Sequence, residues 1–122
     1  MIGYTSLGTN DLASAANFYD TLFSLLGGKR VFEFEDFVVW GKDDSEPKFS
    51  IHLPYDKNTA TVGNGVMVAL TAESKILVKS VYETAISMGA TCEGRPGYRM
   101  DGFYSAYFRD LDGNKLNVHV FE

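Results

Sequence analysis

The chain has 122 residues, of which 45% are hydrophobic and 22% charged, a size and balance typical of one domain with its own buried core. The formal net charge is −5 and the basic residues are scattered, so we expect no nucleic-acid partner. We expect a cytoplasmic protein with no membrane role, since no apolar run approaches the roughly 20 residues that span a bilayer and a lone Cys92 allows no internal disulfide.

The first half of the chain predicts one strand, one helix and then three strands. Residues 2–7 alternate loosely and end at a glycine, which is typical of a short strand that enters a turn. Asn10 or Asp11 can accept hydrogen bonds from the first helical turn, and apolar residues then recur at helical spacing up to the glycine pair 27–28. Strands are expected at 30–34, 37–40 and 48–53, with a turn at 42–45 before the last of them.

The second half repeats this order. Residues 66–70 predict a strand, 74–88 a helix closed by Gly89, and further strands are expected near Thr91, at 104–109 and at 115–121. Short echoes support a duplication, because Phe18-Tyr19-Asp20-Thr21 resembles Val81-Tyr82-Glu83-Thr84 and residues 48–53 resemble residues 115–120. We therefore expect a single domain over residues 1–122, built of two βαβββ modules at about 1–58 and 64–122 and joined through 54–65.

Residues 94–102 are rich in turn formers and predict a loop that carries Arg95 and Arg99. These arginines could clamp an anionic group, although solvated loop charges are the commoner case. Residues 110–114 resemble a fragment of a calcium loop but lack its glutamate, so they predict a hairpin turn.

Three segments lie in order on the duplicated pattern: residues 7–12 (Leu-Gly-Thr-Asn-Asp-Leu) leading to Phe18-Tyr19, residues 63–70 (Gly-Asn-Gly-Val-Met-Val-Ala-Leu) and residues 108–115 (Phe-Arg-Asp-Leu-Asp-Gly-Asn-Lys). Together they resemble the signatures of the vicinal-oxygen-chelate superfamily of glyoxalases, bleomycin resistance proteins and dioxygenases. The resemblance covers nearly the whole chain and implies an α+β fold in which two tandem βαβββ modules form a curved mixed sheet. It also implies a homodimer, because members of this size commonly pair.

The resemblance also implies four ligand positions, which in metal-dependent relatives typically hold His, Glu, His and Glu. Here the matching positions hold Tyr4, His52, Met67 and Asn117. Phenol, thioether and amide groups are weak ligands, and no carboxylate offsets the dehydration of a dication, so we expect no metal and no other cofactor. By strand parity, His119 lies on the same strand face as Asn117. A divalent metal bound by His52 and His119 therefore remains an alternative.

A small-molecule ligand is expected in the cup that the fold implies. We expect six side chains to line it: Tyr4, Ser50, His52, Met67, Asn117 and His119. Hydroxyl, imidazole, amide and thioether groups suit a neutral or partly aromatic organic compound. Further candidates for the cavity or its rim are Ser6, Ala69, Trp40, Tyr104 and Tyr107, of which Tyr104 and Tyr107 differ in strand parity, so that one of the two belongs in the core.

Three functions remain open from the sequence. The leading hypothesis is a metal-independent binder of a small molecule in a cup or dimer groove, as in the antibiotic-binding members of the superfamily. The alternative is a lyase, isomerase or dioxygenase that uses His52, with Tyr4 beside it as a metal-free pair or with His119 and a metal. A third hypothesis is an interaction module whose cup is filled by side chains.

Overall fold

Two structural units, Met1–Thr61 and Val62–Glu122, make up the chain in the computed structural model, which describes residues 1–43 and 47–122. The boundary between the units falls inside the segment 54–65 that the sequence marks as a connection. The turn expected at 42–45 lies partly outside the described residues. Within those residues, no helix has the length and apolar character that crossing a membrane requires.

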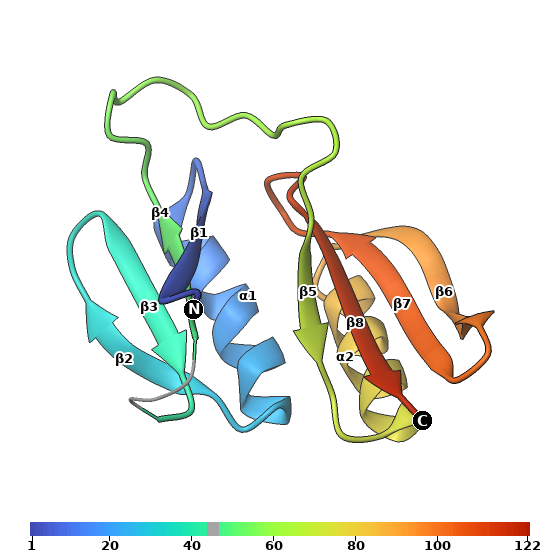
Figure 1. Cartoon of the computed structure of the whole chain (residues 1–122). Helices are drawn as coiled ribbons and strands as arrows, with labels where there is room; N and C mark the ends of the chain where they lie inside the picture. Colours follow the sequence, from blue (N-terminus) through green and yellow to red (C-terminus); the bar gives the residue numbers. More distant parts are fainter. Residues whose placement is uncertain (44–46) are drawn as a thin grey trace. The chain divides into compact units, whose positions relative to one another are not determined.

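The N-terminal unit has the expected order of one strand, one helix and three strands (Figure 1). Its strands form a mixed sheet in the order β1-β4-β3-β2, in which β1 runs parallel to β4 and the other neighbours are antiparallel. The helix α1 covers one face of this N-terminal sheet. The elements are β1 (Tyr4–Gly8), α1 (Leu12–Leu25), β2 (Lys29–Glu33), β3 (Phe37–Gly41) and β4 (Lys48–His52).

The C-terminal unit repeats this topology strand for strand. Its sheet has the order β5-β8-β7-β6, with β5 parallel to β8 and the rest antiparallel, and α2 packs on one face (Figure 1). The fold is therefore α+β, and the duplicated βαβββ pattern is confirmed as two four-stranded mixed sheets. The elements are β5 (Val68–Thr71), α2 (Lys75–Ser87), β6 (Thr91–Met100), β7 (Phe103–Arg109) and β8 (Lys115–Phe121).

Both helices begin and end where local chemistry predicts. The Asp11 side chain accepts a hydrogen bond from the backbone N–H of Ser14 at 3.1 Å, and Ser74 plays the same part for α2. Gly27 and Gly89 follow the two helices with φ of 84° and 104°, a left-handed conformation that glycine adopts without steric cost.

The core of the N-terminal unit is an aromatic cluster between α1 and the sheet. Tyr19 and Phe23 of α1 contact Phe49 of β4, with ring centroids 4.8 Å and 4.9 Å apart, and both also contact Trp40 of β3. Trp40 is 2% exposed and faces the helix. Trp40, which the sequence offered as a candidate for the cavity or its rim, is therefore a core residue.

A polar network closes one side of this core. Asp20 accepts hydrogen bonds from Nε and Nη2 of Arg30 at 2.8 Å and 2.7 Å and from the indole N–H of buried Trp40 at 2.9 Å. The Arg30 guanidinium holds the pKa of Asp20 below its ordinary range, and the Trp40 hydrogen bond adds to this effect against the opposing influence of burial. The network ties α1 to β2 and β3 through one carboxylate.

The core of the C-terminal unit lies between the helix α2 on one side and the strands β7 and β8 on the other. Tyr104 is 7% exposed, and its ring lies 5.7 Å from Nζ of Lys75 of α2, so Tyr104 faces the helix together with Ala106. Tyr107 has the opposite parity and is only half-buried on the other face. The expectation that one of these two tyrosines belongs in the core is confirmed for Tyr104.

The prediction of a loop at 94–102 is wrong for most of that range, because β6 continues to Met100. Register shifts interrupt the pairing of β6 with β7 and accommodate the glycines and the proline that suggested a loop. Arg99 donates hydrogen bonds to the carbonyls of Gly97 and Arg95, and its guanidinium lies 5.3 Å from the ring centroid of Tyr107. Arg99 is thus held against its own strand rather than carried on a rim loop.

Candidate functional site

The candidate site lies on the face of the N-terminal sheet that α1 leaves uncovered. Since Trp40 and Phe49 point toward α1, their strand neighbours Val39 and Ser50 point the opposite way. The strand register places Ser50 between Ser6 of β1 and Val39 of β3. One face of the sheet therefore builds the core and the other builds a site.

An open pocket of about 670 Å³ occupies this face. Pockets that take drug-sized ligands run from roughly 300 to 1,000 Å³, so this volume suits an organic compound of two or more rings. All of its lining residues belong to the N-terminal unit. They are Tyr4, Ser6, Phe32, Phe34, Asp36, Phe37, Val39, Lys48, Ser50, His52, Leu53 and Tyr55.

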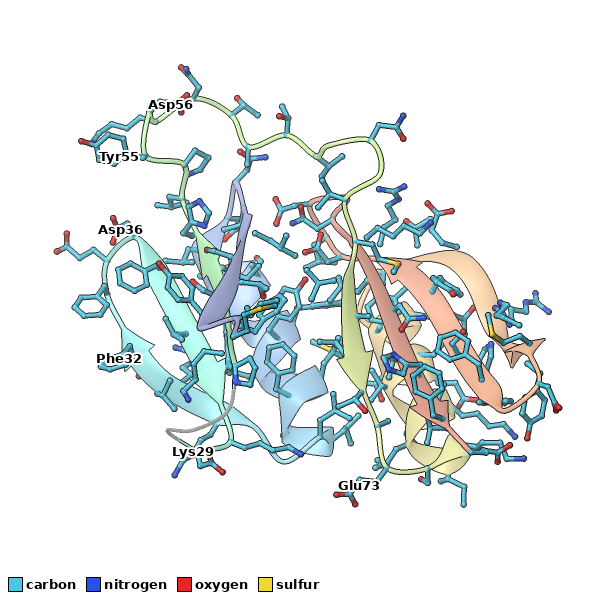
Figure 2. The ribbon with its side chains drawn as sticks, viewed as in Figure 1. Lys29, Phe32, Asp36, Tyr55, Asp56 and Glu73 are labelled. Atoms are coloured by element: carbon cyan, nitrogen blue, oxygen red, sulfur yellow. The ribbon has the colours of Figure 1, made fainter. Side chains whose placement is uncertain are left out.

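Three phenylalanines, Phe32, Phe34 and Phe37, form an aromatic wall along the β2–β3 hairpin. The rings of Phe34 and Phe37 stack at 4.5 Å with 23° between their planes, and those of Phe32 and Phe34 at 6.4 Å with 24°. Phe32 and Phe34 are 59% and 55% exposed, so their faces are open to a ligand. Figure 2 shows Phe32 on β2, Asp36 at the hairpin turn and Tyr55 beyond the end of β4.

A serine–histidine pair forms the polar part of the pocket. The Ser6 hydroxyl lies 2.6 Å from Nδ1 of His52, across the neighbouring strands β1 and β4. The backbone at His52 is fixed as well, because its carbonyl accepts a hydrogen bond from the N–H of Thr9 at 3.0 Å. The Ser6 hydroxyl on the adjacent strand β1 therefore holds the imidazole on a fixed backbone.

A second imidazole lies on the equivalent face of the C-terminal sheet. Tyr104 faces α2, so its cross-strand neighbours on β8 face α2 too, and Asn117 and His119 point away from the helix. Nδ1 of His119 lies 2.7 Å from Oδ1 of Asn117. The ring is flanked by Phe103 and Phe121, each with its centroid 5.4 Å away.

Burial of His119 gives the protein a pH-dependent stability. Desolvation holds the pKa of this imidazole below its ordinary value of 6.5. As the pH falls below that value the unfolded chain takes up a proton that the folded chain does not, so stability declines toward the lower folded pKa. We expect urea unfolding to show a lower midpoint at about pH 5.5 than at about pH 7.5, and His119→Gln to remove part of this difference. An unchanged difference in the variant would contradict this account of His119.

Two buried polar atoms near this imidazole, Oγ of Ser105 and Nδ2 of Asn117, have no hydrogen-bond partner within the described residues. A buried hydroxyl without a partner reduces stability, so Ser105→Ala should leave the free energy of unfolding unchanged or raise it by up to about 1 kcal/mol. Urea denaturation measures this change, and Ser87→Ala, at an exposed helical serine, serves as the control. A loss of 1 kcal/mol or more, on the same scale, would show that Ser105 has a partner.

The six residues expected to line the cup fall into three groups. Tyr4, Ser50 and His52 line the pocket of the N-terminal unit. Asn117 and His119 form a hydrogen-bonded pair in the C-terminal unit. Met67 precedes β5 and is 43% exposed. The expectation that all six side chains line one ligand-binding cup stays a prediction.

Neither the aromatic wall nor Tyr55 was predicted from the sequence as part of the site. The signal for the wall was available in part, because Phe32 and Phe34 alternate with charged residues in a strand pattern. Glu33 lies between them and Glu35 follows, and this alternation indicates one apolar and one solvated face. Nothing in that pattern assigns the apolar face to a pocket rather than to the core.

Metal-ligating side chains do not gather in the described part of the chain. Over residues 1–43 and 47–122, no group of three or more His, Cys, Asp or Glu side chains is arranged to hold an ion.

The hairpin turn expected at 110–114 is present, with Gly113 at φ 91°. There the Asp110 carboxylate accepts hydrogen bonds from the Asn114 backbone and side chain at 2.9 Å and 3.0 Å.

Comparison with known proteins identifies the family. The family model of the Glyoxalase/Bleomycin resistance protein/Dioxygenase superfamily matches residues 1–118. A solved glyoxalase/bleomycin resistance protein from Albidiferax ferrireducens T118 is 32% identical, with a TM-score of 0.89 over 98% of this chain and 97% of that one. The chain therefore belongs to the glyoxalase/bleomycin resistance protein/dioxygenase superfamily.

More distant solved structures share the fold. A glyoxalase/bleomycin resistance protein/dioxygenase family enzyme from Burkholderia phytofirmans PsJN is 18% identical, with a TM-score of 0.77 over 96% of this chain and 95% of that one. Lactoylglutathione lyase from Agrobacterium tumefaciens is 22% identical, with a TM-score of 0.70 over 98% and 92%. The search of curated proteins finds no match.

Proposed function

We propose that the protein binds a small planar aromatic compound in the pocket of its N-terminal unit and that it does so without a metal ion. The observation that carries this proposal is the aromatic wall of Phe32, Phe34 and Phe37, whose stacked rings line a pocket of about 670 Å³. Flat rings bind such a wall by offset stacking, and the gain comes from burial together with the ring contacts.

The side chains at the family's ligand positions do not fit a hard dication. Tyr4 offers a phenol, Met67 a thioether and Asn117 an amide oxygen that already accepts a hydrogen bond from His119. Only His52 offers a good nitrogen donor. This donor chemistry supports a metal-free site, and no step of the proposed function passes through a metal.

Elemental analysis tests the metal-free part of the proposal. We expect protein purified without chelators or metal-binding tags to contain far less than one metal ion per chain, and added Zn²⁺, Ni²⁺, Mn²⁺ or Fe²⁺ not to bind stoichiometrically. The double variant His52→Ala, His119→Ala is the control. Near-stoichiometric metal in the wild type that disappears in the double variant would overturn the metal-free reading.

A matched pair of probes tests the preference for planar rings. 2-Naphthol and decahydro-2-naphthol share one carbon skeleton and one hydroxyl, but only the first is flat and aromatic. If the aromatic wall is the binding surface, 2-naphthol should bind on the order of fivefold more tightly in an NMR titration, since ring stacking is worth about 1 kcal/mol beyond burial. Equal binding of both probes would overturn the proposed role of the wall.

The same pocket favours one second candidate, a metal-free enzyme that transfers a proton. Tyr4 and His52 both line the pocket, and Ser6 fixes the imidazole. Hydrogen–deuterium exchange at the methyl group of 2-acetylnaphthalene measures proton abstraction next to a carbonyl. Faster exchange with wild-type protein than with His52→Ala would favour the enzyme, and equal rates would favour the binder.

We also propose that the chain forms a homodimer, as family members of this size commonly do. Phe32 and Phe34 are each more than half exposed in the single chain, and a second copy at the pocket rim would reduce that exposure. Light scattering should give a mass twice that of one chain. A mass of one chain at all concentrations would contradict this proposal.

A further inference from the structure

The two histidines occupy equivalent places in the duplicated units but have different hydrogen-bond partners. The repeat of residues 48–53 in residues 115–120 aligns His52 with His119. The strand pairing aligns Ser6 with Ala69, because each lies opposite the residue two places before the histidine. The hydroxyl that holds His52 is thus absent at Ala69, and His119 instead contacts Asn117 on its own strand.

The partner of His119 defines which of its ring nitrogens carries the proton. Oδ1 of Asn117 is a carbonyl oxygen and can only accept a hydrogen bond. Nδ1 of His119, 2.7 Å away, therefore donates. Burial lowers the pKa of this imidazole, and in the neutral ring Nε2 then has a lone pair and no proton.

The partner of His52 permits the opposite arrangement. A serine hydroxyl rotates freely and can donate to an imidazole nitrogen, which Oδ1 of an asparagine cannot do. An O–H···N hydrogen bond from Ser6 to Nδ1 at 2.6 Å leaves the proton of the neutral ring on Nε2. Because Ser6 occupies Nδ1, Nε2 is the ring atom left to meet a ligand in the pocket.

We propose that Ser6 holds His52 as an Nε2–H donor, so that the N-terminal pocket selects planar aromatic compounds that carry a hydrogen-bond-accepting oxygen, such as aryl ketones. This inference rests on the proposed function and adds the polar half of the recognition. His52 binds the oxygen of the ligand, and Ser6 is a positioning residue that acts through His52.

The choice of an oxygen acceptor follows from what the pocket offers. The aromatic wall holds the flat ring system, and a ring system alone makes no use of the imidazole. A ligand that left the Nε2–H of half-buried His52 without a partner would lose the hydrogen bond that this group makes with water. An aryl carbonyl restores that bond, whereas an alkyl group of the same shape does not.

The imidazole nitrogens report the tautomers directly in the free protein. The chain has two histidines, so a ¹⁵N–¹H long-range correlation spectrum contains two ring systems. At a pH where both rings are neutral, we expect His52 with its proton on Nε2 and His119 with its proton on Nδ1. The same tautomer in both rings, or Nδ1–H at His52, would overturn the proposal without any ligand being involved.

Variants at position 6 separate positioning from simple structure. Ser6→Ala should leave His52 as a mixture of tautomers, and Ser6→Thr, which keeps the hydroxyl, should restore the Nε2–H signals. Ser87→Ala, at an exposed serine of α2, is the control and should leave both histidine patterns unchanged. Identical His52 signals in Ser6→Ala and the wild type would show that Ser6 does not position the ring.

Binding of a second matched pair tests the ligand class. 2-Acetylnaphthalene and 2-ethylnaphthalene have similar shapes and differ in one carbonyl oxygen. Wild-type protein should bind the ketone on the order of fivefold more tightly, and His52→Ala should abolish the difference. Equal affinities in the wild type would overturn the acceptor preference while leaving the aromatic pocket intact, and no binding of either compound would instead count against the proposed function.

Discussion

Replacing Asp20 by alanine is expected to destabilise the protein by about 2 kcal/mol, because one carboxylate holds three donors that lose their partner together. Two of these donors belong to Arg30 and the third is the indole N–H of Trp40. The Arg30 pair is about one-third exposed and contributes modestly. Most of the loss comes from Trp40, which is 2% exposed and would keep a buried N–H without a partner.

Glu33→Ala is the matched control for Asp20→Ala. Glu33 also pairs with Arg30 at 2.7 Å, but its side chain is 62% exposed and touches no buried donor. Its removal should change the free energy of unfolding by less than about 1 kcal/mol. Urea denaturation of the two variants measures the contrast, and equal losses in both would show that the buried indole is not what the carboxylate satisfies.

Removing two rings of the aromatic wall is expected to weaken the binding of 2-naphthol on the order of thirtyfold, since each lost ring contact is worth roughly 1 kcal/mol. The double variant Phe32→Ala, Phe34→Ala removes the two exposed rings and leaves Phe37, whose ring stacks on Phe34, in place. Because both rings are more than half exposed, the fold should keep nearly its full stability. An NMR titration gives the affinity and urea denaturation gives the stability.

Ile76→Ala serves as the control for the double variant, because Ile76 lies on α2 and is 76% exposed. It removes exposed apolar surface outside the proposed site and should bind 2-naphthol as the wild type does. If the double variant binds with wild-type affinity, the aromatic wall is not the binding surface. If it loses stability instead, the wall supports the fold and the account of the pocket is wrong.

Periodicity of the sequence predicts the fold well because the two units use ordinary local signals. Apolar spacing marks both helices, Asp11 and Ser74 cap them, and Gly27 and Gly89 end them with positive φ. Strand parity also places Ser50 and His52 on one face of the sheet, and in the structure both line the pocket. The echo between the halves has a direct counterpart in the identical strand orders of the two sheets.

The aromatic wall could not be predicted because a register shift changes strand parity in β2. Regular alternation would place Arg30 and Phe32 on the same face of the sheet. The shift between them lets Arg30 reach Asp20 on the helix side while Phe32 pairs with Val39 and lines the pocket. An irregularity of one residue thus decides whether these phenylalanines belong to the core or to the site.

The end of β6 shows the opposite failure, in which local residues suggest a turn and tertiary pairing prevails. Gly94, Pro96 and Gly97 are turn formers, yet β6 pairs with β7 on both sides of its register shifts. As an edge strand, β6 tolerates a proline that a central strand would not. Pairing with β7 therefore determines the strand conformation of this segment, and its local composition alone does not predict that pairing.

The most direct test of metal-free binding in the N-terminal pocket is a chemical-shift map of ¹⁵N-labelled protein with 2-naphthol, after dialysis against a chelator. The account predicts saturable shifts at the amides of the pocket strands β1, β2, β3 and β4, with an affinity that added Zn²⁺ does not change. Shifts confined to the C-terminal unit, or binding that appears only after metal is restored, would contradict it.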